Sequence, residues 1–293
     1  MAQLKEIRGR IASIKNTRQV TSAMKMVSAA KLKKAQDAIL RITPYERKLH
    51  HIIQNLSLGD VHFDSVYFSE PKAEKILIVV VGTNRGLCGA FNSNIYKTAL
   101  IHTMNDYKYQ LNLGQVKFMA IGKQVEKSLK SKKVDLLGEA NHLLEKLTYE
   151  NASELALQLM ELFTSGQYNR IDLIYNKFKN AASQILSAEQ FLPVKKPEQV
   201  EKALILPDYI FEPSQDEILN SLIPESLKMR IYRILLDSDA AEQGARMTAM
   251  HQATDNATEL MGQLRMQYNN ARQSAITNEI LEITAGAEAL TGT

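Results

Sequence analysis

The sequence has one cysteine, no tryptophan and only seven prolines among its 293 residues. A lone cysteine, Cys88, cannot form an intramolecular disulfide, so the chain suits a reducing compartment. The longest apolar run, residues 76–81, is far shorter than the roughly 20 residues that a membrane-spanning helix needs. The first ten residues also lack the apolar core of a signal peptide. With 45% hydrophobic and 23% charged residues, the composition is that of a globular protein.

Motifs that carry chemistry are equally scarce. The six histidines show no HExxH pattern or other short metal-ligand spacing. There is no GxSxG motif, and a cysteine in a glycine-rich turn is more typical of a small packed residue than of a nucleophile. The sequence therefore predicts no catalytic residue, no cofactor and no metal site.

The net charge of +4 hides a strong asymmetry between the ends of the chain. Residues 1–41 hold ten Lys/Arg and two acidic residues, about +8, whereas residues 208–293 hold six and thirteen, about −7. A basic N-terminal section could bind nucleic acid. The aromatic content of 6% and the acidic section in the same chain instead favour a solvated face or pairing of the two ends.

Both ends have helical patterns of unusual length. Residues 4–41 contain no proline, and their apolar side chains recur at helical spacing, as in Ile7, Ile11, Ile14, Met24 and Val27. The stretch Thr43–Glu46 resembles a capping box with proline at the first helical position, which predicts a kink or a new helix start. Helical pattern then continues to about residue 57.

The C-terminal section has no proline after Pro224, and the remaining residues would extend roughly 100 Å as a helix. Its expected lining positions are small or flexible: Ala245, Met247, Ala249, Met250, Ala253, Ala257, Met261 and Met266. We expect sections 1–57 and 208–293 to form an antiparallel helix pair with one narrow apolar seam. Such a pair is marginally ordered, so hydrogen exchange should be fast over 2–40 and 230–290.

Between the helices the period changes to that of an α/β domain, over residues 72–195. The β-branched runs predict strands at 75–82, 116–122, 171–178 and 184–192, the first of them buried and parallel. Helical patterns occupy 92–105, 122–131 and 150–165. The predicted fold class is therefore α/β plus a long helical coiled coil: an antiparallel pair of terminal helices with an inserted, small Rossmann-like α/β domain.

The sharpest local signal is the loop Gly82–Asn92, which follows the first predicted strand. A glycine-rich strand-to-helix turn can bind phosphate through backbone N–H groups, so a nucleotide-dependent enzyme is one hypothesis. The spacing here is GxxxGxxG, and the GK[ST] ending of a phosphate-binding loop is missing. Tight-turn and packing roles are favoured instead.

Three motifs together resemble the gamma subunits of F-type ATP synthase. They are IRGRIASIKNT (7–17) with AMKMV (23–27), RGLCGAFN (85–92), and YNNARQSAITNEI (268–280) with ITAGA (283–287). The resemblance covers essentially the whole chain and is of the bacterial type, without a transit peptide. Many members have Gly-Leu where this loop has Ala90-Phe91, and the chloroplast dithiol insertion is absent, so a disulfide switch is not expected.

The resemblance implies a mechanical role and no bond chemistry. The terminal helices would form the shaft inside a ring of three alpha and three beta subunits, and the α/β domain would lie at the membrane-proximal foot with the epsilon subunit and the c-ring. The delta subunit of the F1 sector is a further expected partner. Rotation driven by protons or sodium ions would turn the shaft and drive the beta subunits through their catalytic conformations. The chain would be peripheral, at the cytoplasmic face of the bacterial inner membrane, and attached only through the Fo sector.

Residue roles also follow from the resemblance. Contact with beta would come from Arg272 and Gln273, and at the same level of the shaft from Met24, Lys25, Lys33 and Lys34. The apolar tip in the sleeve of the ring would comprise Ile280, Leu281, Ile283, Ala285, Ala287 and Leu290. The foot near the c-ring and epsilon would include Tyr209, Phe211 and Glu212. Arg170, at the edge of a predicted strand, is expected to matter little.

Overall fold

A computed structural model describes residues 2–57, 66–69, 72–132, 134–181, 183–194, 212 and 214–291. The chain divides into two compact units. Residues Met1–Ser28 and Met247–Thr293 form one, named here the two-helix segment, and Ala29–Arg246 form the other, named the α/β unit. The α/β unit is wider than the predicted domain 72–195, because it includes part of each long helix.

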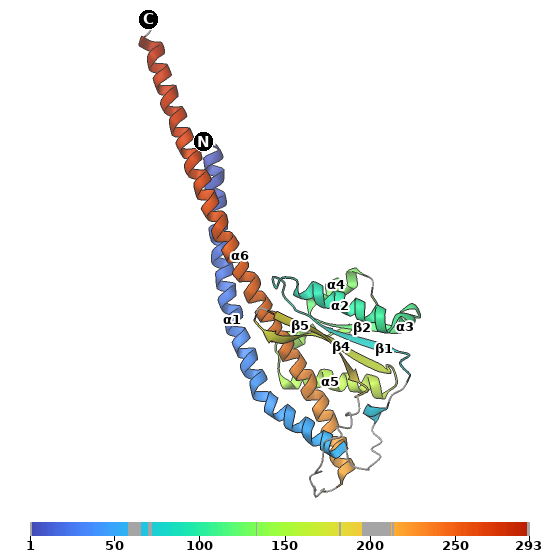
Figure 1. Ribbon diagram of the computed structural model, residues 1–293. Helices are drawn as coiled ribbons and strands as arrows, with labels where there is room; N and C mark the ends of the chain where they lie inside the picture. Colours follow the sequence, from blue (N-terminus) through green and yellow to red (C-terminus); the bar gives the residue numbers. More distant parts are fainter. Residues whose placement is uncertain are drawn as a thin grey trace. The chain divides into compact units, whose positions relative to one another are not determined.

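A five-stranded sheet forms the centre of the α/β unit. Its strands are β1 (Ile76–Val81), β2 (Val116–Ile121), β3 (Leu136–Glu139), β4 (Arg170–Asn180) and β5 (Ser183–Leu192). They lie in the order β3-β2-β1-β4-β5 (Figure 1), with all neighbours parallel except β4 and β5. The four predicted strands are confirmed, and β3 was missed.

Helices cover both faces of this sheet (Figure 1). The odd-numbered residues of β1 pack with α5 (Tyr149–Thr164) and with the first part of α6 (Gln215–Thr291). The even-numbered residues pack with α2 (Phe91–Asp106) and α4 (Lys123–Ser131). All six residues of β1 are buried, which explains why this strand reads as a continuous apolar run. The short helix α3 (Lys108–Asn112) was not predicted.

The N-terminal helix α1 is continuous over Ala2–Ser57, with Pro44 inside it. The predicted new helix start is therefore wrong. The Thr43 hydroxyl donates to the Ile39 carbonyl 2.7 Å away instead of capping a helix. Glu46 pairs with Arg233 of α6 at 2.5 Å, so contact between the two helices overrides the local capping signal. Figure 1 does show α1 changing direction in its light-blue part.

The C-terminal helix α6 begins at Gln215, directly after Ser214, whose hydroxyl accepts the Glu217 N–H at 3.3 Å as an N-cap would. Pro224 lies inside this helix. The first part of α6 belongs to the hydrophobic core, where residues such as Leu219, Ile231 and Leu235 are at most 2% exposed. Close packing against the sheet thus holds the helix on both sides of the proline.

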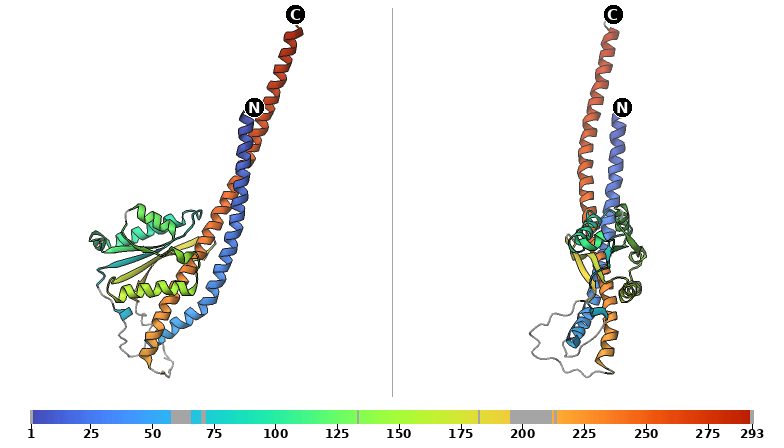
Figure 2. Two further views of the ribbon diagram at one scale, coloured as in Figure 1. Left: turned by 180° about the vertical axis from the view of Figure 1, so that it is seen from behind. Right: turned by 90° about the vertical axis from the view of Figure 1, so that its right-hand side faces the viewer.

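In the two-helix segment, α1 and α6 lie antiparallel (Figure 2). Arg8 contacts Tyr268, Thr21 contacts Thr254, and Lys25 contacts His251, so paired residue numbers sum to about 276. Few side chains are buried along the seam. Three of the predicted lining residues, Met250, Ala257 and Met261, are 5–6% exposed and confirm the seam, but Met266 is 67% exposed and lies outside it.

Candidate functional site

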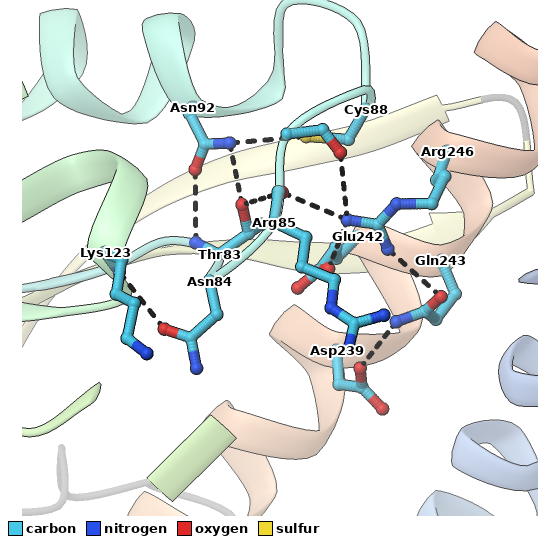
Figure 3. Close-up of polar contacts among 11 residues, drawn as sticks. Thr83, Asn84, Arg85, Cys88, Asn92, Lys123, Asp239, Glu242, Gln243 and Arg246 are labelled. Atoms are coloured by element: carbon cyan, nitrogen blue, oxygen red, sulfur yellow. Dashed lines mark hydrogen bonds and ion pairs between the residues drawn. The ribbon is translucent and has the colours of Figure 1, made fainter. Parts of the chain in front are cut away.

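The loop between β1 and α2 is held together by side-chain contacts of its own (Figure 3). The Asn92 carboxamide accepts the backbone N–H of Thr83 at 3.1 Å and donates to the Thr83 hydroxyl at 2.8 Å. The same amide nitrogen lies 3.3 Å from the sulfur of Cys88. Cys88 is 3% exposed and burial raises the pKa of its thiol, which fits the predicted packing role.

Gly82, the first glycine of this loop, serves packing, whereas Gly89 has a positive φ of 63°. A Cβ at Gly82 would lie 2.1 Å from a methyl group of Val125, so the start of α4 fits against the loop only because Gly82 has no side chain. Gly122, just after β2, has φ 118°, and a Cβ there would lie 2.7 Å from the Thr83 backbone nitrogen. Asn84 accepts the Lys123 backbone N–H at 3.1 Å. These contacts favour the turn interpretation over phosphate binding.

Helix α6 binds the outer side of the loop through Arg246 (Figure 3). One guanidinium nitrogen of Arg246 donates to the carbonyl oxygens of Arg85 and Gly86 at 3.1 and 3.4 Å, and lies 2.6 Å from the Glu242 carboxylate. The other donates to Gln243 at 3.2 Å. We call Glu242, Gln243, Arg246 and the two carbonyl groups the Arg246 clasp.

The clasp is buried and electrostatically balanced. Arg246 is 7% exposed and Glu242 is 9% exposed. Burial raises the pKa of Glu242 to about 7, and the Arg246 charge opposes that rise. Burial likewise raises the pKa of Asp239, which accepts a hydrogen bond from Gln243 at 3.0 Å. Sequence reasoning missed the clasp, although a Glu–Arg pair four residues apart in an apolar stretch was a possible signal.

A second polar cluster surrounds Asp172 of β4, which is 1% exposed. His102 Nε2 lies 2.9 Å away, the Tyr107 hydroxyl donates at 2.5 Å, and Arg170 Nε donates at 3.2 Å. Burial favours a high pKa for Asp172, but these three hydrogen bonds outweigh it and lower the pKa. The hydrogen bond to Asp172 raises the pKa of His102, which also pairs with Asp106 at 2.8 Å.

The Asp172 cluster joins the end of α2 to the sheet and resembles structural ion pairing rather than a catalytic site. Arg170 was expected to matter little, but it helps to neutralise the buried carboxylate of Asp172. Among the described residues, no group of three or more His, Cys, Asp or Glu could hold a metal ion. Within the same residues, no helix has the length and apolarity to cross a membrane.

The predicted beta-contact residues fall at different levels of the helices. Arg272 and Gln273 are exposed on α6, and the helix register places them level with about residue 4 of α1. Lys25 is level with His251, about 30 Å of helix away from Arg272, and Met24 is its neighbour. The structure therefore does not bring these two groups together as expected. Lys33 and Lys34 are exposed and belong to the α/β unit.

The predicted tip residues lie on a part of α6 that continues past the start of α1 (Figure 2). Ala2 is level with about residue 274, and beyond it Ile280, Leu281 and Ile283 are 55%, 59% and 67% exposed. Ala285 and Ala287 are exposed as well. Large exposed apolar side chains on a helix end are typical of a surface that a partner protein covers.

The remaining predicted residues lie at or beyond the limits of the described structure. The side chain of Leu290 is outside the described residues, as are Tyr209 and Phe211 of the predicted foot. Glu212 is described and exposed.

Comparison with known proteins gives consistent matches over the full chain. A sequence profile described as ATP synthase matches residues 3–290. ATP synthase gamma chains of Flavobacterium johnsoniae and Christiangramia forsetii are 54% and 50% identical, each over 100% of this chain and of the relative. A chain of the Euglena gracilis mitochondrial ATP synthase, solved with OSCP, F1 and c-ring, has a TM-score of 0.71 at 20% identity, covering 99% of this chain and 95% of its own. That likeness supports the fold.

Proposed function

The chain belongs to the ATP synthase gamma-chain family, and from that premise we propose that it is the central rotor shaft of an F-type ATP synthase. It is not itself catalytic; the complex is the enzyme. Its partners are three alpha and three beta subunits, the epsilon and delta subunits, and the c-ring. It is a peripheral subunit, which we place at the cytoplasmic face of the bacterial inner membrane.

The observation that carries this proposal is the two-helix segment with its exposed apolar end. A helix pair with so few buried side chains gains little stability from its own seam. Its exposed surface offers instead a different set of contacts in each direction around the helix axis. When the pair turns inside a ring, each orientation has different contact energies with the three beta subunits, and only such differences can shift their conformations.

The exposed residues have distinct proposed roles in that ring. Ile280, Leu281 and Ile283 would turn within the apolar sleeve, together with Ala285, Ala287 and Leu290. Arg272 and Gln273 would contact acidic loops of beta, since a guanidinium group matches carboxylate geometry. Met24 and Lys25 would contact beta at a different level of the helix pair. Lys33 and Lys34 would contact beta from the α/β unit.

Direct observation of rotation tests the proposal. A bead is attached through a cysteine at Tyr109, which is 73% exposed, in a complex of alpha, beta and this chain that is fixed through beta. The alpha and beta subunits carry no other reactive cysteine in this design. ATP should drive the bead in one direction. Sustained ATP hydrolysis with a motionless or randomly turning bead would refute the rotor assignment.

The contact of Arg272 with beta needs a separate test in the same complex. Arg272→Ala should leave the complex assembled and lower its ATPase rate severalfold, because a charged hydrogen bond contributes about 1.5–3 kcal/mol. Arg265, exposed and two turns earlier on α6, is the matched control; Arg170 is unsuitable because it neutralises Asp172. Equal losses for Arg272→Ala and Arg265→Ala would show that the contact is wrongly assigned.

A further inference from the structure

Helix α6 is joined to the α/β sheet at two loops by residues within one turn of each other. Arg246 binds the loop that follows β1 through two carbonyl groups. Gly244 faces the turn between β4 and β5, where a Cβ would lie 3.1 Å from the carbonyl oxygen of Ala181. One contact is a buried ionic joint, and the other is a close backbone approach that only a small residue permits.

The geometry of the ionic joint depends on the guanidinium group. Arg246 serves two carbonyl oxygens, the Glu242 carboxylate and the Gln243 amide oxygen with its fixed fork of donors. A lysine carries the same charge on a single ammonium group and cannot reach all four acceptors in this geometry. Glu242, with its pKa raised by burial to about 7, compensates the buried arginine above neutral pH, so its loss would leave the arginine without this partner.

The apolar core resists separation of α6 from the sheet, but it offers less resistance to sliding of α6 along the sheet. Apolar contacts are non-directional, whereas hydrogen bonds to fixed backbone carbonyls are directional. Gln243, which accepts a hydrogen bond from Arg246, is held in turn by Asp239 of the same helix at 3.0 Å. A helix that slid or turned against the sheet would have to break the two hydrogen bonds from Arg246 to the Arg85 and Gly86 carbonyl groups inside a buried site.

We propose that the Arg246 clasp is a torque-transmitting joint, which makes helix α6 turn as one body with the α/β sheet. The inference rests on the proposed rotor function. Arg246 and Glu242 are positioning residues: they touch neither nucleotide nor the catalytic subunits in this role. When ATP hydrolysis turns an unloaded helix pair, little torque crosses the joint. When ion flow must drive ATP synthesis, the full torque crosses it.

The test compares loaded with unloaded operation of the same enzyme. Arg246→Ala and Arg246→Lys are measured for ATP hydrolysis in the detached complex and for ATP synthesis in energised membrane vesicles. Hydrolysis should change less than about twofold, and synthesis should fall about tenfold, the factor expected for loss of a charged hydrogen bond. Glu242→Gln should give a smaller loss of the same kind. Lys228→Ala, which breaks the partly buried pair with Glu225 away from the clasp, is the control and should change neither rate.

Substitution at Gly244 tests the same joint without changing Arg246. A Cβ at Gly244 would lie 3.1 Å from the carbonyl oxygen of Ala181, so Gly244→Ala should loosen the close approach of α6 to the sheet and lower synthesis more than hydrolysis, as Arg246→Ala does. Parallel loss of hydrolysis and synthesis in Arg246→Lys, or wild-type synthesis in Arg246→Ala, would overturn the clasp. Failure of the rotor function itself would appear instead as an unmoving bead in the wild-type complex.

Discussion

The two units of this chain are built by opposite rules. In the α/β unit, all six residues of β1 are buried, and alternate side chains fill two separate cores. In the described part of the two-helix segment, the buried side chains are Thr21, Ser28, Met250, Ala257 and Met261. Two of these five are polar. The α/β unit is stabilised by its own cores, whereas most of the described side chains of the two-helix segment are not buried.

This difference shows where function and stability are separated in the chain. A packed core contributes most of the free energy of folding, and exposed apolar and charged surface contributes most of binding. A rotor needs both, because its surface must change partners without unfolding. The comparison predicts that perturbations of equal chemistry will have very unequal effects in the two units.

The largest expected effect is in hydrogen exchange of the isolated full chain. Amides of β1 and β4 should exchange about a thousandfold more slowly than those of 2–28 and 247–287, because core strands open only with global unfolding. Residues 230–246 should be slow as well, since Ile231, Ile234 and Leu235 are at most 3% exposed in the core. The sequence predicted fast exchange over 230–290, but the structure limits that C-terminal fast region to residues after 246. Similar protection of amides in both units would contradict the claim that the α/β unit is the more stable of the two.

A pair of core substitutions gives the next largest effect. Leu159→Ala on α5 empties a position that is 0% exposed and should cost about 2–5 kcal/mol of unfolding free energy. Met261→Ala on the seam, 6% exposed, should cost about 1 kcal/mol, because one neighbouring helix surrounds it incompletely. Urea unfolding of the full chain, followed by circular dichroism, measures both. Equal costs would mean that the seam is a core in its own right.

The predictable part of this fold is the part with strong periodicity. The strands 76–81, 116–121 and 170–180 could be predicted because buried parallel strands appear as continuous apolar runs. Strand β3 was missed because its four residues are mostly exposed at the sheet edge and include Gly138. The new helix start predicted at Pro44 was wrong because Glu46 pairs with Arg233, 187 positions away in the chain, and α1 continues through the proline.

The site was predictable in its motif but not in its contacts. The glycine loop stood out in the sequence, and its packing role followed from its spacing. Its partner Arg246 lies 160 positions beyond Gly86, so the local spacing of Glu242 and Arg246 could indicate an ion pair but not that this pair binds the loop. Asp172 was likewise hidden, because a lone Asp within an apolar strand does not indicate that His102 and Tyr107 will meet it.

A pH-dependent effect of intermediate size should appear in the α/β unit. The pKa of His102 is raised, so its protonated form stabilises the fold below about pH 6.5, and this contribution is lost as pH rises through the folded-state pKa. The pKa of Asp172 is lowered, so its contribution is present above about pH 3.8 and is lost in acid. The charged groups that face His102 are Asp172 and Arg170 of β4 and Asp106 of α2.

His102→Gln tests this effect, because glutamine can still donate a hydrogen bond but cannot be protonated. The variant should be less stable than wild type by up to about 1 kcal/mol at pH 5.5, and the difference should shrink as the pH rises above the folded-state pKa of His102. Urea unfolding at a series of pH values measures it. A constant difference across that range would assign His102 a packing role only.

The smallest expected effect concerns the hydroxyl pair between the two helices. Thr254 Oγ1 lies 2.8 Å from Thr21 Oγ1, and Thr21 also donates to the Arg18 carbonyl at 3.1 Å. Thr254→Val keeps the shape and removes the hydroxyl, so Thr21 loses one partner but retains the other. The cost should be about 0.5–1 kcal/mol, the net value of one neutral hydrogen bond. Faster exchange of amides 250–258 in the full chain is the measurement.

Thr258→Val is the matched control, because its hydroxyl bonds only to the Thr254 carbonyl of its own helix, at 2.9 Å, among the contacts that the structure describes. It should leave exchange nearly unchanged. Neither substitution should alter the exchange of β1, because distant sites without shared partners act additively. If Thr254→Val also speeds exchange in β1, the two units unfold together. The two-helix segment would then unfold only together with the α/β unit, and the two units would differ in their exposed surfaces but not in their stability.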